Sequence, residues 1–361
     1  MKITDLSVTM FSYTVAENAR YPGPADVPRR GGKLESGLLT IHTDEGVEGN
    51  YFTGGGDAGS ILSQLKPVLV GQNPLDIGRL WYAMERRMKY LHGITLQAIG
   101  AVDIALWDLA GKVTSQPIHR LLGTCRDKVP AYASSANMPT PEEYVEEALD
   151  YKSKGWTAYK IHPHVNVKED IEICRAVRKA VGDDMVLMLD VWYYGYEDAL
   201  RVGKVIEDLG FIWYEDPLAE DDLYGYIRLK EKLYIPLLAT ERTPGGLYGL
   251  APFILMRATD ILRGDVMKGG ITNLMKIAHL AEAFRMKCEI HTANIGNLHV
   301  IMAINNCDYW EVLLPKQYQQ PGLVNQITVD SQGMVHAPES PGLGCEIDWD
   351  YVKKHTTRVL Q

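Results

Sequence analysis

The chain has 361 residues, of which 46% are hydrophobic and 23% charged, and its formal net charge is −9 at pH 7. This acidic balance excludes partners that need a basic face, so we expect neither a nucleic acid nor a membrane surface. No apolar run approaches membrane-spanning length, and the opening MKITDLSVTM lacks a signal-peptide core. The five cysteines are scattered without CxxC spacing, which is typical of reduced thiols in a cytoplasmic protein.

Residues 1–120 have the pattern of an α+β capping domain. Three stretches have strand-like composition: 3–15, 35–44 and 47–55. The last two are separated by a tight turn at Asp44–Gly46, which predicts a hairpin. Three later stretches show helical spacing of apolar residues: 61–71, 73–90 and 95–115. We expect substrate specificity to depend on the loop around 92–95 and on the Pro/Gly-rich loop at 16–33, which is long enough to close over a site.

Residues 121–320 contain eight strand candidates, from Val129 to Leu313, with helical stretches between them. Five apolar runs end in an acid or a histidine at intervals of 25, 26, 24 and 26 residues: Asp190, Glu215, Glu241, Asp265 and His291. A strand followed by a helix, repeated at this spacing, is typical of parallel βα units. The spacing is compatible with an open parallel sheet, but eight units favour a barrel. The predicted fold class is therefore α/β, a modified (β/α)8 TIM barrel with an N-terminal α+β capping domain.

The last part of the chain, 321–361, lies beyond the βα repeat. Its residues 325–337 have the pattern of a hairpin outside the barrel. We expect this C-terminal segment, hairpin included, to return to the capping domain.

Chemically reactive side chains lie at the ends of these strands. Lys160 and His162 share a face of one strand, because alternate residues point the same way. Parallel strands place their carboxyl ends on one face of a barrel, so side chains from distant positions converge there. Three carboxylates in one site repel one another unless a cation is present. We therefore predict a divalent metal held by Asp190, Glu215 and Glu241, and all-oxygen ligation favours Mg²⁺ over Zn²⁺.

The order of these residue types on six successive strands, and the helix text AIGAVDIALWDLAGKVTSQPIHRLLG at 98–123, resemble the enolase superfamily. The resemblance is to its mandelate racemase-like (mandelate racemase/muconate lactonizing enzyme) branch and covers essentially the whole chain. It implies that the three carboxylates bind Mg²⁺ and that Asp265 and His291 form a catalytic dyad. It also implies that Lys160 contacts the substrate carboxylate and that Glu311 hydrogen-bonds a carboxylate oxygen. Finally, it implies a homo-oligomer.

The second strand departs from the racemase, which carries Lys-x-Lys where this chain has Lys160–Ile161–His162. Some acid-sugar dehydratases of the branch also place a histidine there. We expect His291 to be the base and His162 to donate a proton from the opposite side of the substrate. Glu311, if protonated, could donate a hydrogen bond to the carboxylate.

These expectations lead to a Mg²⁺-dependent lyase that removes the proton alpha to a carboxylate. The resulting enediolate would lose its β-hydroxyl, so that an acid sugar becomes a 2-keto-3-deoxy acid. One alternative is a racemase, epimerase or cycloisomerase that acts through the same enediolate. A second alternative is a non-catalytic barrel that binds an acid. The sequence leaves the identity of the sugar acid open, together with the roles of His164, Arg242 and Lys268.

Overall fold

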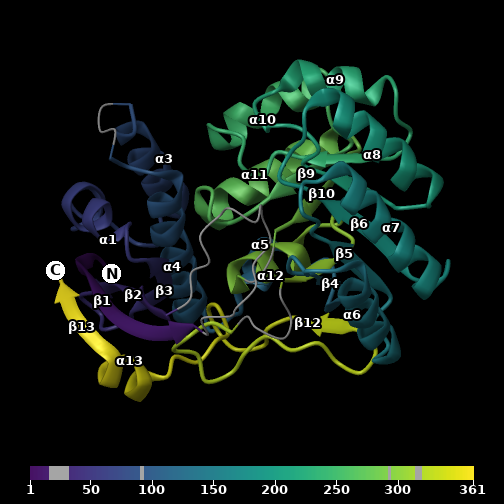
Figure 1. Ribbon diagram of the computed structural model, residues 1–361. Coiled ribbons are helices and arrows are strands. Elements are labelled where there is room, and N and C mark those ends of the chain that lie inside the picture. The colour runs from purple at the N-terminus through teal and green to yellow at the C-terminus, as the bar shows by residue number, and fades with distance from the viewer. Residues whose placement is uncertain (16–31, 90–92, 292–293, 314–318) are drawn as a thin grey trace.

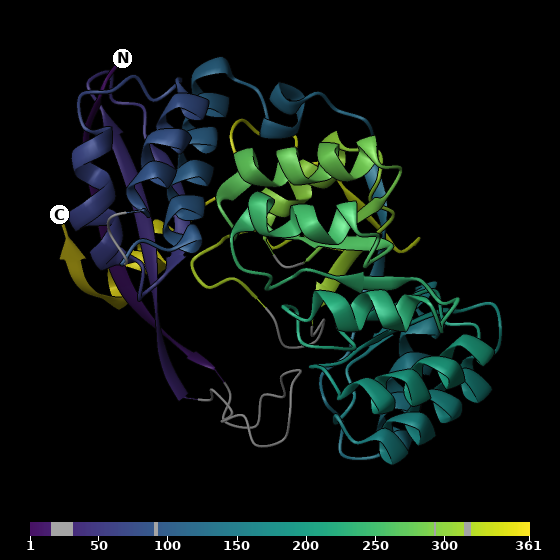
Figure 2. The ribbon, with the colours of Figure 1, turned by 90° about the horizontal axis from the view of Figure 1, so that it is seen from above.

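The capping domain and the barrel lie side by side, and both chain termini are in the cap (Figures 1 and 2). The structure is a computed structural model that describes these residues: 1–15, 32–89, 93–291, 294–313 and 319–361. Within these ranges no helix has the length and apolarity needed to cross a membrane. The predicted loop at 16–33 lies outside the described residues, except for its last two, which begin strand β2. Position 92 of the other predicted specificity loop also lies outside them.

The cap contains a four-stranded antiparallel sheet in the order β13-β1-β2-β3. Its strands are β1 (Ile3–Val15), β2 (Gly32–Thr43), β3 (Gly49–Gly54) and β13 (Thr356–Leu360). The pairing of β2 with β3 confirms the predicted hairpin at Asp44–Gly46. Adjacent residues of a strand face opposite sides, so Leu39 packs against the cap helices while Leu38 packs with Val352 on the other face.

Helices cover one face of this sheet. They are α1 (Ala58–Ser60), the π-helical turn η1 (Ile61–Leu65), α2 (Lys66–Leu69), α3 (Ile77–Arg87) and α4 (Leu96–Thr114). The next helix, α5 (Ile118–Leu122), packs with the barrel core through Ile118. Helix α4 begins where Thr95 Oγ1 accepts a hydrogen bond from Ala98 N at 3.0 Å, an ordinary N-cap. The helix lies so close to β3 that a Cβ at Gly49 would be 2.1 Å from Ala105 O. Glycine therefore permits this approach.

The barrel is made of eight parallel strands in the order β10-β9-β8-β7-β6-β5-β4-β11. They are β4 (Lys128–Ser134), β5 (Ala158–Ile161), β6 (Val186–Asp190), β7 (Tyr214–Glu215), β8 (Leu237–Ala239), β9 (Ile261–Gly264), β10 (Lys287–Ile290) and β11 (Trp310–Leu313). The helices between them are α6 (Pro141–Ser153), α7 (Val167–Val181), α8 (Tyr196–Asp208), α9 (Leu223–Lys230), α10 (Gly246–Leu255), α11 (Gly270–Ala283) and α12 (Ile295–Ala303). This order confirms the predicted modified (β/α)8 barrel behind an N-terminal α+β cap.

The two end strands of the barrel sheet, β10 and β11, share no backbone ladder within the described residues. The buried Glu289 side chain of β10 reaches across this seam. Its carboxylate accepts hydrogen bonds from the backbone N–H groups of Asp308 and Tyr309, at 2.8 and 3.3 Å. Burial raises the pKa of Glu289 to about 7. The side chain thus supplies some of the hydrogen bonds that a ladder would have made.

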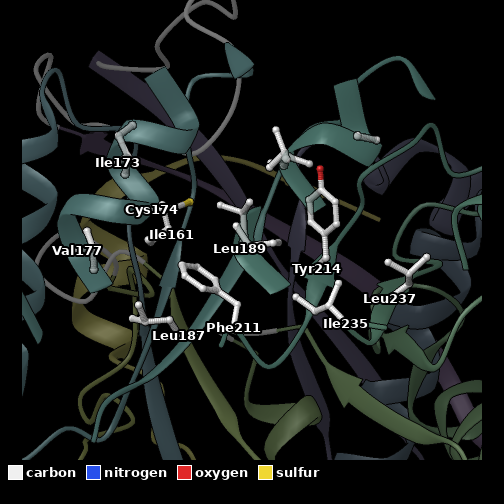
Figure 3. Packing of buried hydrophobic residues seen from close by; sticks show 14 of the residues in the cluster. Ile161, Ile173, Cys174, Val177, Leu187, Leu189, Phe211, Tyr214, Ile235 and Leu237 are labelled. Carbon is white, nitrogen blue, oxygen red and sulfur yellow. The ribbon is translucent and has the colours of Figure 1, made fainter. Parts of the chain in front are cut away.

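The barrel strands separate an outer core from an inner one. Leu187 and Leu189 of β6 pack outward with Ile173 of α7 (Figure 3). Met188 belongs to a different cluster, in the barrel interior. Because side chains alternate along a strand, Asp190 at the end of β6 shares the inward face of Met188. The same alternation directs the polar residues at the other strand ends into the barrel mouth.

The C-terminal segment contacts both domains. Its elements are β12 (Met334–His336), α13 (Trp349–His355) and β13. The predicted hairpin at 325–337 is wrong, because this stretch forms only β12, which pairs antiparallel with β4 of the barrel. The β4 edge offered unpaired backbone groups at Lys128–Pro130, which a sequence pattern does not reveal. The predicted domain limits at 120 and 320 stay a prediction.

Candidate active site

Lys160 is the centre of the predicted site. It is fully buried in β5, and its Nζ lies 2.7 Å from Asp190 Oδ2, 2.9 Å from Glu215 Oε2 and 2.8 Å from Glu311 Oε1. Burial and the nearby Arg263 oppose the charged ammonium, but the three carboxylates outweigh them and raise the pKa of Lys160 well above its ordinary value. Lys160 is therefore a fixed positive charge between three strand ends.

Arg263 is a second buried cation that the sequence reasoning missed. Its Nε lies 2.9 Å from Glu215 Oε1, and its Nη2 contacts Glu311 and donates to Tyr132 Oη at 3.2 Å. Burial opposes ionisation of Glu311, but Arg263 and Lys160 prevail and lower its pKa. The two cations in contact with Glu311 therefore favour its ionised form, whereas donation of a hydrogen bond to substrate requires its neutral form. The available signal was position: Arg263 stands two residues before Asp265, on the same face of a strand.

His162 lies beside Asp190. Its Nε2 is 2.9 Å from Asp190 Oδ2, and its Nδ1 is 2.7 Å from the carbonyl oxygen of Ser135. Both ring nitrogens therefore face acceptors, an arrangement in which the ring acts as a donor. The backbone N–H of His162 donates to Ser135 Oγ at 2.9 Å, which fixes the end of β5.

His291 and Asp265 form the predicted pair. His291 Nδ1 lies 3.0 Å from Asp265 Oδ2, within hydrogen-bond reach. Burial lowers the pKa of His291, but Glu241, Asp265 and Glu311 raise it to about 9. Asp265 is held in turn by Asn297, whose Nδ2 donates to Asp265 Oδ1 at 3.1 Å. The pair has the geometry of a base with an orienting carboxylate.

The three predicted metal ligands end neighbouring strands, but they are not gathered as a ligand set. Among the described residues no three His, Cys, Asp or Glu side chains are grouped so that they could hold a metal. Asp190 and Glu215 both contact Lys160, while Glu241 Oε1 lies 3.6 Å from Arg242 Nε. The arrangement of these side chains around a metal is therefore a proposal.

The donor chemistry of this region does fit a hard cation. Asp216, directly after Glu215, is a partly buried residue whose Oδ1 atom is buried and has no hydrogen-bond partner among the described residues. Burial raises its pKa well above the ordinary value, and Glu220, Glu241 and nearby Asp190 raise it further. An excess of buried carboxylate oxygens is the environment in which Mg²⁺ binds. Neither Asp216 nor Glu220 is among the site residues predicted from the sequence.

Backbone strain is found at the same strand ends. Asp216 and Thr240, which stand next to two predicted ligands, have φ of 46° and 88°. Positive φ is unfavourable for residues with a Cβ and is found most often at functional sites. Lys268 Nζ donates to Thr240 O at 3.2 Å. Burial lowers the pKa of Lys268, against the opposing effect of Glu220 and other nearby carboxylates.

His164 and Arg242, whose roles the sequence left open, lie at the edge of this region. His164 is tied to the loop after β5, with Nδ1 3.1 Å from Glu169 Oε2 and Nε2 in contact with Met138 O, a structural arrangement. Arg242 is mostly exposed and stacks over the Trp192 ring at 4.9 Å.

Two family models match the chain. Residues 143–351 match a model described as enolase C-terminal domain-like. Residues 24–123 match the model of the mandelate racemase/muconate lactonizing enzyme N-terminal domain. These matches confirm the resemblance predicted from the sequence.

Characterised relatives include dehydratases and a racemase. The chain is 31% identical to the arabinonate dehydratase of Saccharolobus solfataricus, over 87% of this chain and 88% of the relative. It is 29% identical to the D-xylonate dehydratase of Haloferax volcanii, over 88% of this chain and 84% of the relative. It is 27% identical to the N-succinyl-L-Arg/Lys racemase of Bacillus cereus, over 93% and 92%. The chain is therefore an enzyme, which excludes the non-catalytic alternative.

A solved structure agrees with these matches. The D-glucarate dehydratase of Agrobacterium tumefaciens, solved in complex with magnesium, superposes with a TM-score of 0.93 at 36% identity. The match covers 99% of this chain and 100% of that one.

Proposed function

The chain belongs to the mandelate racemase/muconate lactonizing enzyme family of the enolase superfamily, and we propose that it dehydrates an acid sugar to a 2-keto-3-deoxy acid. The observation that carries this proposal is the pairing of His291 with Asp265 at 3.0 Å, at the end of the barrel that also holds buried Lys160. A base and a fixed cation are the two requirements for removing a proton alpha to a carboxylate.

In the first step, His291 takes the α-proton of the substrate. Nδ1 of the ring bonds to Asp265, so Nε2 is the nitrogen that accepts the proton. Asp265 orients the ring and stabilises the imidazolium that results. The bond from the α-carbon to hydrogen breaks, and its electron pair enters the carboxylate system as an enediolate.

The developing negative charge is held next to Lys160. Its ammonium is already desolvated and fixed by carboxylates, so little reorganisation is needed when charge develops on the substrate. Mg²⁺ held by Asp190, Glu215 and Glu241 would supply further positive charge at the substrate carboxylate. We propose that Glu311, kept ionised by Arg263 and Lys160, fixes the position of the Lys160 ammonium rather than donating to the substrate.

In the second step, the β-hydroxyl leaves. His162 donates a proton to the departing oxygen, so that the bond from the β-carbon to oxygen breaks and water forms. The enol that remains becomes the 2-keto-3-deoxy acid. An imidazole has an ordinary pKa near 6.5 and gives up a proton at neutral pH more readily than the lysine of the racemase pattern.

A racemase or epimerase remains the second candidate. It is favoured by the 27% identity to the N-succinyl-L-Arg/Lys racemase and by histidines that directly follow two different strands, β5 and β10. In that reaction His162 would return a proton to the α-carbon instead of donating it to a hydroxyl. The two reactions share His291 and differ only in the second half.

The test is a panel of aldonic and aldaric acids incubated in deuterated water with Mg²⁺. Loss of the α-proton signal reports the first step, and keto-acid formation reports dehydration. His291→Asn should abolish both, while His336→Asn, at an exposed histidine of β12, should change neither. Turnover should also stop when a chelator removes Mg²⁺ and return when Mg²⁺ is restored.

His162→Ala separates the candidates. For a dehydratase it should slow keto-acid formation severely but leave some α-proton exchange through His291. If the wild-type enzyme inverts an α-centre and forms no keto acid from any acid of the panel, the dehydratase proposal is wrong. The predicted homo-oligomer stays a prediction that sedimentation would measure.

A further inference from the structure

Helix α4 of the cap contains two buried acids in an otherwise apolar stretch. Asp103 and Asp108 are 0% and 3% exposed. Asp108 accepts hydrogen bonds from Leu343 N at 2.9 Å and Asn50 N at 2.8 Å, and pairs with Lys112 at 2.6 Å. It therefore joins α4 to the cap sheet and the C-terminal segment. Asp103 instead contacts the barrel.

Asp103 contacts the first turn of α11, a barrel helix. Its Oδ2 accepts a hydrogen bond from Thr272 N at 2.9 Å, and its Oδ1 accepts one from Thr272 Oγ1 at 2.6 Å. The local N-cap residue of α11 is Gly269, which has no side chain to offer. A carboxylate at a helix N-terminus satisfies unpaired N–H groups and favours the helix dipole. Asp103 thus caps α11 from another domain.

Glycines make room for this contact. A Cβ at Gly270 would lie 2.2 Å from Asp103 Oδ2, and Gly270 has φ of 84°. On the other side of the interface, a Cβ at Gly100 of α4 would lie 2.8 Å from Val266 O and 3.0 Å from Gly270 N. The two backbones are therefore in direct contact.

Further hydrogen bonds join the same barrel segment to the cap. Trp81 Nε1 donates to Gly269 O at 2.6 Å, and Gly269 N donates to Leu96 O at 3.0 Å. Trp107 Nε1 donates to Thr272 Oγ1 at 3.0 Å. Residues 266–272 are thus fixed by α3 and α4 at several points.

This segment begins directly after Asp265. Met267 N donates to Asp265 Oδ1 at 2.9 Å, and Lys268 N donates to Asp265 O at 3.0 Å. The orientation of the Asp265 carboxylate, and hence its bond to His291, depends on where this turn lies. The far end of the turn is the helix start that Asp103 caps.

We propose that Asp103 is a positioning residue, which from the cap fixes the 266–272 turn and thereby holds Asp265 against His291. The role deepens the proposed function and rests on it for its effect on turnover. It also makes the cap part of the catalytic framework, because a displacement of about 1 Å at such a pair can cost on the order of 100-fold in rate.

The experiment measures the titration of the His291 ring by NMR in metal-free, histidine-labelled protein, with the signal assigned by its loss in His291→Asn. Asp265, Glu241 and Glu311 are the charged groups that raise the pKa of His291, to about 9. In Asp103→Asn, the amide oxygen can accept from only one of the two Thr272 donors while the NH₂ faces the other, so the cap on the turn is weakened. We expect the pKa of His291 to fall by about one unit, since one charged hydrogen bond is loosened.

Turnover supplies the second readout. Asp103→Asn should lower kcat by about tenfold or more while KM changes by less than about twofold, because the reacting base and not the substrate contacts is displaced. Asp108→Asn is the matched control on the same helix. It should lower the unfolding midpoint but leave the titration of His291 and kcat unchanged.

A milder pair keeps the test informative should Asp103→Asn fail to fold. Thr272→Val removes the hydroxyl, which donates to Asp103 and accepts from Trp107 Nε1, and should shift both readouts in the same direction by less, whereas Thr272→Ser should restore them. If the variant that folds titrates at His291 as the wild type does, the positioning role is wrong. If the wild type converts no sugar acid, the proposed function fails, but the titration still decides the role of Asp103.

Discussion

Replacing Arg263 by methionine tests whether the buried guanidinium holds the carboxylates at the barrel centre. Arg263 contacts Glu215 and Glu311 and is itself 1% exposed. Methionine approximates the volume of the arginine stem, so the change removes charge and hydrogen bonds more than packing. Lys160 would then be the remaining described cation in contact with both carboxylates.

The expected cost is about 3–5 kcal/mol in the free energy of unfolding, the range for removing one partner of a buried ion pair. The estimate has two parts. Arg263 Nη2 makes two charge-assisted hydrogen bonds, to Glu311 and to Tyr132, worth about 1.5–3 kcal/mol each. Relief of the desolvation of Arg263 offsets some of that loss. Lys160 also keeps both carboxylates partly compensated, so the cost should not reach the sum of two unpaired charges.

Urea unfolding of the metal-free protein measures this cost, with circular dichroism and tryptophan fluorescence followed together because cap and barrel can unfold separately. The control is Arg201→Met on α8, where Arg201 and Asp198 are 3.4 Å apart and largely exposed. That change should cost less than about 1 kcal/mol. A loss below about 1 kcal/mol for Arg263→Met as well would refute the view that Arg263 holds the two carboxylates.

Two other predictions concern the catalytic pair and the cap. Asp265→Asn removes a carboxylate that raises the pKa of His291. Because the base must be neutral to accept a proton, the rise of kcat/KM with pH should move to lower pH, and the maximum rate should fall. A pH–rate profile measures both changes. If the pH–rate profile of Asp265→Asn matches that of the wild type, Asp265 does not raise the pKa of the catalytic base. Gly49→Ala should destabilise the cap by about 1–3 kcal/mol in thermal or urea unfolding. The new Cβ would clash with the backbone oxygen of Ala105, which is held in helix α4. Gly78→Ala in α3, where no atom lies within 4 Å, should be neutral or slightly stabilising.

The sequence by itself determined the barrel and placed most of the candidate site residues at the ends of its strands. The 24- to 26-residue period reflects the length of one βα unit, which is a local property of the chain. Alternation along each strand then fixes which face a side chain takes, so Lys160, Asp190 and Glu215 could be assigned to the barrel mouth in advance. The pairing of Asp265 with His291 was implied by the family resemblance, and the two side chains can meet because the adjacent parallel strands β9 and β10 end side by side.

Tertiary structure alone decided what neutralises the buried charges and what holds the catalytic turn. Arg263 looks like one polar residue in an apolar strand until the fold brings Glu215 and Glu311 to it from positions 48 residues away on each side. Asp103 is 169 residues from the helix that it caps. The strand β12 pairs with β4 because that edge was unpaired, against the hairpin that local spacing predicted. These outcomes depend on contacts between distant segments, whose energy is set by burial and by the partners available in the folded chain, and neither is encoded in any local pattern.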